Sequence, residues 1–149
     1  MKLISQGAQY AISAIITLAK QSPGTTVSAA ALAEPLNCPP AYLSQVLSKL
    51  KPAGILKSRR GLNGGVYLVR DPEEIPLIDV IKAIDGMDFF EHCFLGIEGC
   101  GTIEPCPFHN FWSEERDKIQ DWLANTTFAD CEQSMSQAWF DLRFQFNND

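Results

Sequence analysis

The chain has 149 residues, of which 46% are hydrophobic and 20% are charged. This is the balance of a globular protein large enough to bury a core, and no stretch approaches the roughly 18 to 20 consecutive apolar residues that a membrane span needs. The N-terminal segment has an apolar run but no cleavage-site pattern, so we interpret it as a folded helix and not as a signal peptide. We therefore expect a cytoplasmic protein with no membrane partner.

The net charge of −6 hides an uneven distribution. Residues 1–72 contain eight Lys and Arg and two acids, which gives +6, whereas residues 73–149 contain four bases and sixteen acids, which gives −12. Basic groups neutralise the phosphates of nucleic acid, and acidic groups are repelled by them. We therefore expect DNA to approach the N-terminal part only, and we divide the chain into two regions at residue 72.

Three helices are predicted in the first region. Apolar residues recur at helical spacing from Ser5 to Gln21, and Ser28 is a suitable N-cap for a short second helix that ends near Glu34. A third helix is predicted from Pro39 to about Pro52. Its outward-facing residues are of types that contact bases and phosphates: Tyr42, Ser44, Gln45, Ser48, Lys49 and Lys51.

A hairpin is predicted next, with strands at residues 54–58 and 66–69. The connection contains Asn63 and Gly64, which we expect to supply the positive φ angles of a tight turn. Two helices with a short break, followed by such a hairpin, are typical of a winged helix-turn-helix. In that fold the third helix enters the major groove and the hairpin is a wing. Arg59 and Arg60 are candidate DNA contacts, with Arg60 in the minor groove.

The second region begins with a predicted helix after Pro76, which runs to about Ile84, and an irregular stretch from Gly86 to about Pro107. A long helix with an apolar stripe follows. The stripe consists of Phe108, Phe111, Trp112, Ile119, Trp122 and Leu123. A stripe this aromatic is expected to be covered, either by the same helix of a second subunit or by the chain's own first region. We favour a homodimer because two subunits suit a DNA site made of two half-sites.

Three of the five cysteines lie in a glycine-containing loop, at about residues 91–107, with the spacing Cys93-x6-Cys100-x5-Cys106-x2-His109. Five is an odd number for a disulfide framework, and clustered thiols in a reducing compartment favour metal binding or redox sensing. Glycines allow the thiolates to converge on one iron-sulfur cluster. His109 follows Cys106 by one helical turn, which makes it a suitable fourth ligand.

Other interpretations of this loop remain open. A structural zinc is one, although the gaps are wider than is typical of zinc sites, and a nucleophilic pair of Cys106 and His109 is another, with no orienting group in evidence. In or beside the loop lie three further candidate ligands: His92, Glu98 and Glu104. The remaining cysteines, Cys38 and Cys131, are interpreted as packing residues, because small thiols are commonly buried.

Four features carry a family resemblance: the MKLIS start, the segment Ala41–Leu47, the wing Arg60-Gly61-x-x-Gly64-Gly65, and the three-cysteine loop before an amphipathic helix. They extend over nearly the whole chain. In them the chain resembles the Rrf2 family of winged-helix transcription regulators, of the IscR- and NsrR-like kind. Leu62 and Asn63 stand where the wing usually has proline and glycine, and Ser44 stands where one well-known member has glutamate, so the DNA target cannot be transferred.

The resemblance implies a mainly α fold with a small β-hairpin wing, in which a long C-terminal helix mediates dimerisation. It also implies a homodimer on double-stranded promoter DNA, with a cluster that alters DNA affinity. By analogy the ligands are Cys93, Cys100, Cys106 and His109. Family members with 4Fe-4S clusters can take a carboxylate from the partner's N-terminal helix, but residues 1–33 contain no Asp or Glu. We therefore favour a 2Fe-2S cluster.

The sequence thus predicts a repressor-type transcription regulator, not an enzyme, that responds to redox state, iron or nitric oxide. Two alternatives are kept. One is a cluster-free regulator of the same fold that senses thiol oxidation or binds a partner protein. The other, less favoured, is an iron-sulfur carrier or redox protein that uses the wing as a protein-binding surface.

Overall fold

The computed structural model describes residues 3–101 and 104–134. In chain order the elements are α1 (Gln6–Ala19), α2 (Ala29–Ala33), α3 (Pro40–Ser48), β1 (Leu56–Arg59), β2 (Gly65–Leu68), the 3-10 helix η1 (Pro72–Glu74), α4 (Leu77–Asp85), α5 (Asp88–Glu91), α6 (His109–Asn125) and α7 (Phe128–Ser134). The structure is mainly helical with one two-stranded antiparallel sheet, which confirms the predicted fold class.

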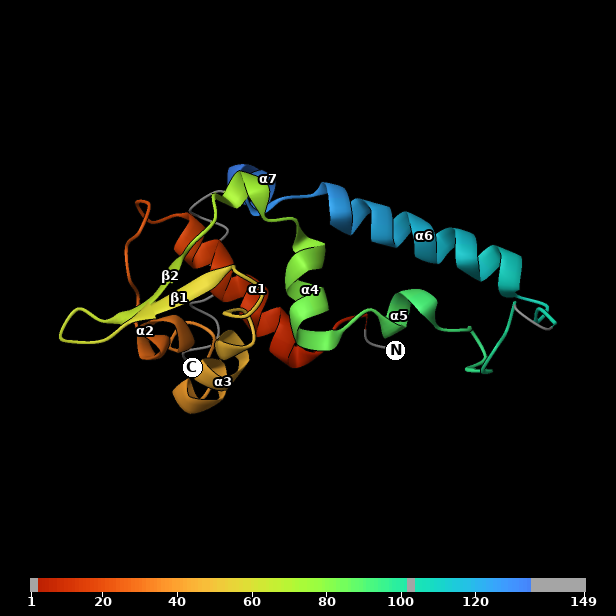
Figure 1. The fold of residues 1–149 in the computed structure, drawn as a ribbon, viewed down its shortest axis with the longest axis horizontal. Helices are drawn as coiled ribbons and strands as arrows, with labels where there is room; N and C mark the ends of the chain where they lie inside the picture. Colours follow the sequence, from red (N-terminus) through yellow and green to blue (C-terminus); the bar gives the residue numbers. More distant parts are fainter. Residues whose placement is uncertain (1–2, 102–103, 135–149) are drawn as a thin grey trace.

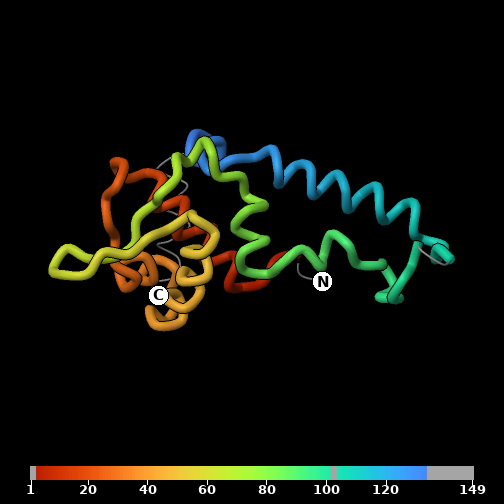
Figure 2. The backbone as a smooth tube through the Cα atoms, in the orientation of Figure 1, coloured from red at the N-terminus to blue at the C-terminus, as the bar shows by residue number. Residues whose placement is uncertain are grey.

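The structure is elongated and has two parts (Figure 1). The body contains α1 to α4, the hairpin and α7, and an arm made of α5, α6 and the loop between them extends from it. We call that loop the cysteine loop. The hairpin and the cysteine loop lie at opposite ends of the long axis, as the backbone trace shows (Figure 2). The cysteine loop is therefore separated from the hairpin by the length of the body.

Helix α1 forms the centre of the body. The Ser5 hydroxyl caps it by accepting a hydrogen bond from the Ala8 N–H at 3.1 Å. The apolar stripe predicted from the sequence is fully buried, with Ala8, Ala11 and Ile15 each 0% exposed. Helices α3, α4 and α7 all pack against α1, so its buried residues form the centre of the hydrophobic core.

Helices α2 and α3 are separated by a short break. Ser28 caps α2 as predicted, by accepting a hydrogen bond from the Ala31 N–H at 3.1 Å. Asn37 lies in the break with a φ of 50°, a left-handed conformation that asparagine tolerates better than most residues. This turn redirects the chain so that α3 packs against α2 and α1.

Helix α3 is shorter than predicted. It begins after Pro39 but ends at Ser48, whereas the sequence suggested an end near Pro52. Pro52 has no N–H to continue the helical hydrogen bonds, and Gly54, with a φ of 74°, turns the chain into the hairpin. The apolar face predicted for this helix is buried and consists of Leu43, Val46 and Leu47.

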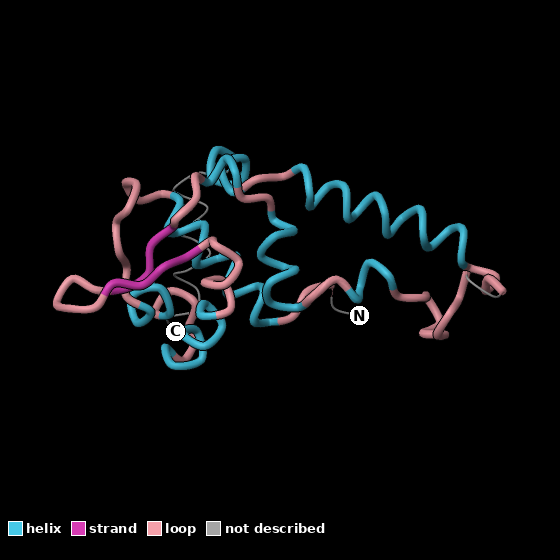
Figure 3. Tube along the Cα trace, viewed as in Figure 1, coloured by secondary structure: helices cyan, strands magenta, loops and turns pink. Residues whose placement is uncertain are grey.

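The hairpin forms, but its turn differs from the predicted one (Figure 3). The ladder closes at the pair Arg59 and Gly65, so residues 60–64 form the connection. The positive φ angles lie at Gly61 (113°) and Gly65 (154°), and the prediction that Asn63 and Gly64 would supply them was wrong. A connection of this length spreads the reversal over more residues than a two-residue turn does.

Helix α4 starts after Pro76 as predicted. The sequence suggested that the stretch after α4 would be irregular. Residues 88–91 instead form the short helix α5. Phe90 is only 4% exposed there and belongs to the hydrophobic core. Burial of this side chain stabilises a helical turn that local sequence preference alone would not predict.

The end of α6 returns to the body. Leu123 is 3% exposed and Phe128 is 0% exposed, and the Phe128 N–H donates to the Ile75 carbonyl at 3.0 Å. Phe111 and Trp122 are instead 72% and 59% exposed. The Leu123 end of the apolar stripe therefore packs on the chain's own body. That the rest of the stripe contacts a second subunit stays a prediction.

Among the described helices, none combines the length and apolar character needed to cross a bilayer.

Candidate functional site

The outer face of α3 carries three of the predicted DNA-contacting residues. Ser44, Gln45 and Lys49 are exposed, whereas Leu43 and Leu47 are buried against the rest of the body. Because successive helical positions are about 100° apart, burial of the apolar side leaves the polar side facing solvent. Among the described residues, the polar face of α3 is therefore exposed to solvent.

Tyr42 is also on α3 but has a packing role. Its ring meets the ring of Tyr10 edge-on, with centroids 6.1 Å apart, and its hydroxyl oxygen would lie 3.2 Å from a Cβ placed on Gly7. With 38% of its surface exposed, Tyr42 can touch DNA only with the part of its side chain that is not packed against α1. Sequence reasoning missed this contact because it joins two separate helices.

The two wing arginines differ in their surroundings. The Arg59 guanidinium lies 4.4 Å from the centroid of the Tyr67 ring and donates to the Gly24 carbonyl at 3.5 Å. Arg60 is exposed and has no hydrogen bond or ion pair with any other described residue. Lys57, which pairs with Tyr67 in the sheet, is a further exposed cation on this wing and was not among the predicted contacts. Residues two apart in a strand share a face, so the position of Lys57 two residues before Arg59 is the signal that could have identified it.

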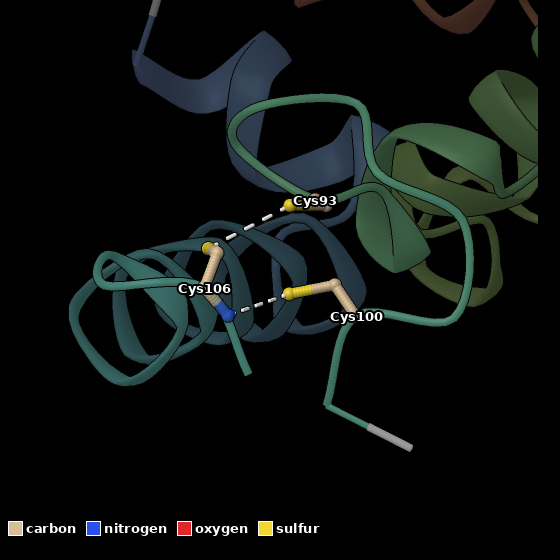
Figure 4. A group of neighbouring side chains, drawn as sticks. All are labelled: Cys93, Cys100 and Cys106. Atoms are coloured by element: carbon tan, nitrogen blue, oxygen red, sulfur yellow. Dashed lines mark hydrogen bonds between the residues drawn. The ribbon is translucent and has the colours of Figure 1, made fainter. Parts of the chain in front are cut away.

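The three loop cysteines lie together in the arm (Figure 4). The sulfur atoms of Cys93, Cys100 and Cys106 are all within 4.8 Å of one another, and those of Cys93 and Cys106 are 3.7 Å apart. Two thiolates bound to one tetrahedral metal at about 2.3 Å would be about 3.8 Å apart. The loop therefore presents its thiols at separations compatible with binding one metal centre.

His109 lies beside this group but is not part of it. It is the first residue of α6, and its Nδ1 is 3.5 Å from the sulfur of Cys100. Gly101 leaves room for the imidazole ring, because a Cβ at that position would be 2.3 Å from His109 Cε1. Gly101 also has a φ of 90°, in the region that favours glycine.

The start of the cysteine loop is tied to α6. The His92 carbonyl accepts hydrogen bonds from Trp112 Nε1 at 2.7 Å and from an Arg116 guanidinium nitrogen at 3.0 Å. The Phe94 ring packs against the rings of Trp112 and Phe108, at centroid distances of 5.8 and 5.3 Å. These contacts fix the chain on both sides of Cys93, the first cysteine of the group.

The surroundings of the thiols change their acidity. Hydrogen bonds from the backbone N–H groups of Ile97 and, secondarily, Leu95 stabilise the thiolate and lower the pKa of Cys93 to about 7. Burial has the larger effect at Cys106 and raises its pKa. The backbone N–H of Cys106 donates to the sulfur of Cys100 at 3.2 Å. Cys93 is therefore more easily deprotonated than Cys106.

The other candidate ligands do not belong to the thiol group. His92, Glu98 and Glu104 are exposed, and no atom of theirs belongs to the group of potential metal ligands found in the described part of the chain. Cys38 is 7% exposed within the hydrophobic core, and Cys131 packs against that core. Burial raises the pKa of both thiols, in agreement with the packing roles predicted for them.

A cavity of about 580 Å³ lies beside the thiols. Its lining includes Cys93, Cys100, Gly99, His109, Trp112 and Arg116. Three thiols and an imidazole are ligands that iron and zinc accept, and the cavity has room for an inorganic group larger than a single ion. The ligand types and the space beside them therefore fit an iron-sulfur cluster.

The order of helices and hairpin, the exposed recognition face and the thiol group together define a winged-helix regulator with a candidate metal centre. A sequence profile of the Rrf2 family, described as "Iron-dependent Transcriptional regulator", matches residues 4–133. The chain belongs to the Rrf2 family of transcription regulators.

Individual relatives agree with this assignment. The chain is 34% identical to the HTH-type transcriptional regulator IscR of Serratia proteamaculans over 130 residues, which cover 87% of this chain and 78% of the relative. CymR, the global cysteine regulator of B. subtilis, has a similar structure, with a TM-score of 0.75 and 29% identity over 91% of this chain and 100% of CymR.

T. potens IscR matches with a TM-score of 0.73 and 27% identity, over 93% of this chain and 90% of that protein. These relatives are named as transcription regulators, so the chain is a regulator and not an enzyme.

Proposed function

We propose that this chain is a cytoplasmic, homodimeric transcription repressor whose binding to promoter DNA depends on a 2Fe-2S cluster. Residues 1–72 form the DNA-binding domain, and residues 73–149 hold the cluster and the dimer contact. The observation that carries the proposal is the gathering of three thiols within 4.8 Å on an arm of an Rrf2-family regulator. The signal would be redox state, iron supply or nitric oxide.

The proposed ligands are Cys93, Cys100, Cys106 and His109. The 3.5 Å separation between His109 Nδ1 and the Cys100 sulfur supports the histidine as the fourth ligand. The absence of Asp and Glu from residues 1–33 favours a 2Fe-2S over a 4Fe-4S cluster. When bound, such a cluster supplies a one-electron redox centre whose potential is raised by nitrogen ligation.

The DNA contacts are assigned to two surfaces. Ser44 and Gln45 on α3 would contact base edges in the major groove, with Lys49 on a phosphate. Arg60 would enter the adjacent minor groove, where a narrow A·T tract concentrates negative potential. Tyr42 and Arg59 would contact DNA with only part of their side chains, because both are held by neighbouring residues of the body.

The homodimer is proposed from the exposed aromatic residues of α6. Phe111 and Trp122 are too exposed, at 72% and 59%, to contribute to the core of one subunit. Burial of the same surface on both subunits around a two-fold axis would cover them. It would also place two recognition helices for two half-sites.

A route from the cysteine loop to the recognition helix runs through the end of α4. Asp85, the last residue of α4, is hydrogen-bonded to Ser5 at the start of α1. Two residues after Ser5, Gly7 lies against Ile84 and the Tyr42 hydroxyl. Helices α1, α3 and α4 therefore meet at a position that has no side chain. A change in the arm that shifts α4 would therefore shift the recognition helix relative to α1.

A cluster-free thiol sensor is the second candidate. It is supported by the 3.7 Å separation of the Cys93 and Cys106 sulfurs, by the lowered pKa of Cys93 and by the similarity to CymR, the global cysteine regulator. An iron-sulfur carrier is less supported, because the relatives are named as transcription regulators.

Substitution of one cysteine separates these candidates. Cys100→Ala, purified without oxygen, should lose its visible absorption and its iron while keeping the helical circular dichroism of the wild type. Cys131→Ala is the matched control, since Cys131 packs near the core, and should keep both. An unchanged spectrum and iron content in Cys100→Ala would contradict the ligand assignment.

A further inference from the structure

Leu62, at the tip of the wing, is the most exposed large apolar side chain in the described part of the protein. Its exposed fraction is 106%, and the next highest, that of Phe111, is 72%. Leu62 belongs to the connection of the hairpin, and the hairpin extends from the body at the end of the molecule opposite the cysteine loop (Figure 1). No other residue that the structure describes covers it.

The turn that presents Leu62 is braced. The Thr26 hydroxyl donates to the Asn63 carbonyl at 2.6 Å, and Val27 pairs with Val66 through two backbone hydrogen bonds of 3.0 and 2.9 Å. A Cβ on Gly65 would be 2.3 Å from the Val27 carbonyl oxygen, so the wing lies directly against the chain before α2. These contacts hold the base of the turn and direct Leu62 outward.

The neighbours of Leu62 are suited to a minor groove. Arg60 is an exposed cation without a partner among the described residues, and a narrow A·T-rich minor groove attracts arginine. The walls of that groove are the apolar faces of deoxyribose, and proteins that enter it often add leucine or another apolar side chain. Leu62 lies two positions from Arg60, so the cation and the apolar side chain belong to the same turn of the wing.

We infer that Leu62 is an apolar minor-groove contact, entering beside Arg60 and packing against the sugars of an A·T pair. The inference rests on the proposed DNA-binding function and deepens it. Because a guanine amino group projects into the minor groove, this contact disfavours G·C at the pair beneath the wing. Leu62 would then determine part of the target preference without a hydrogen bond.

The first test compares affinity and its salt dependence. The probe is a duplex of about 30 base pairs selected from a random library by the wild-type protein, which allows two half-sites one or more helical turns apart. Leu62→Ala should weaken binding about tenfold through the partly buried carbon atoms it removes, with no change in the salt slope. Leu62→Met should bind like the wild type. Arg60→Ala should instead lower the slope by about one per wing.

A second test alters only the minor groove. Replacing the A·T pair beneath the wing by G·C should weaken wild-type binding, and replacement by inosine·C, which lacks the amino group, should restore it. The Leu62→Ala variant should bind the G·C duplex and the inosine·C duplex with equal affinity. Equal affinity of Leu62→Ala and wild type, or equal sensitivity to the amino group, overturns the inference alone. Failure of the wild type to select any duplex in any cluster state overturns the DNA-binding function as well.

Discussion

Asp85 joins the end of α4 to the start of α1 through Ser5. Its carboxylate accepts a hydrogen bond from the Ser5 N–H at 2.8 Å and another from the Ser5 hydroxyl. A negative charge at this helix N-terminus is also favoured by the dipole of α1. Since α4 continues through Gly86 into the arm, this contact attaches the base of the arm to the DNA-binding body.

Asp85→Ala should uncouple the arm from the recognition helix. Loss of the two hydrogen bonds at an exposed site should lower the free energy of unfolding by about 1 kcal/mol. The larger effect should be on regulation, with the difference in DNA affinity between cluster-bound and cluster-free protein reduced. Denaturant titration and binding assays measure the two effects. Asp121→Ala, which removes the same charge from the exposed face of α6, is the control and should change neither.

Gly101→Ala should displace the His109 ring and change the electronic environment of the metal centre. The new Cβ would lie 2.3 Å from His109 Cε1, closer than two non-bonded carbon atoms can approach. Gly99→Ala is a matched control, because Gly99 also has a positive φ, of 72°, but has nothing within 4 Å of an added Cβ. The electron-paramagnetic-resonance spectrum should shift in the first variant only. Identical shifts in both variants would assign the effect to backbone strain.

The metal-free protein should react with iodoacetamide first at Cys93. Because the pKa of Cys93 is lowered to about 7, its thiolate is the reactive form from neutral pH upward, and the rate should rise to half its maximum near that pH. Burial raises the pKa of Cys106, so its modification should need more alkaline conditions. Peptide mass spectrometry over a pH series measures both. Earlier modification of Cys106 would contradict the thiolate assignment.

The dimer contact is tested by removing the exposed aromatic side chains of α6. The double variant Phe111→Ala, Trp122→Ala should shift sedimentation from dimer to monomer, because these side chains are 72% and 59% exposed in one subunit. The circular dichroism should stay helical, since neither residue belongs to the core. If the double variant still sediments as a dimer, Phe111 and Trp122 do not form the dimer interface.

Most of the helices could be predicted because their signals are local. Ser5 and Ser28 cap α1 and α2 by hydrogen bonds within three residues, and Pro76 marks the start of α4. The turn of the wing could not be predicted in the same way. Its base is held by Val27, which precedes it by more than thirty residues, so the positions of positive φ depend on tertiary contacts.

The candidate site was predictable in composition but not in its supports. The spacing of the cysteines and their glycines indicated that the thiols would converge, and they do lie within 4.8 Å. The hydrogen bonds to the His92 carbonyl from Trp112 and Arg116 were not foreseeable, because a backbone carbonyl carries no sequence signal. The contact between Ser5 and Asp85 was not foreseeable for another reason, because the two residues are eighty positions apart and meet only through tertiary packing.

The central claim is that the thiol group holds a redox-active iron-sulfur cluster. The most direct measurement is the absorption and electron-paramagnetic-resonance spectrum of protein purified without oxygen, together with iron and zinc analysis. If the thiols hold a 2Fe-2S cluster, we expect a coloured protein with about two irons per chain and a paramagnetic signal on one-electron reduction. A colourless protein without iron, or one with a single zinc, would contradict it.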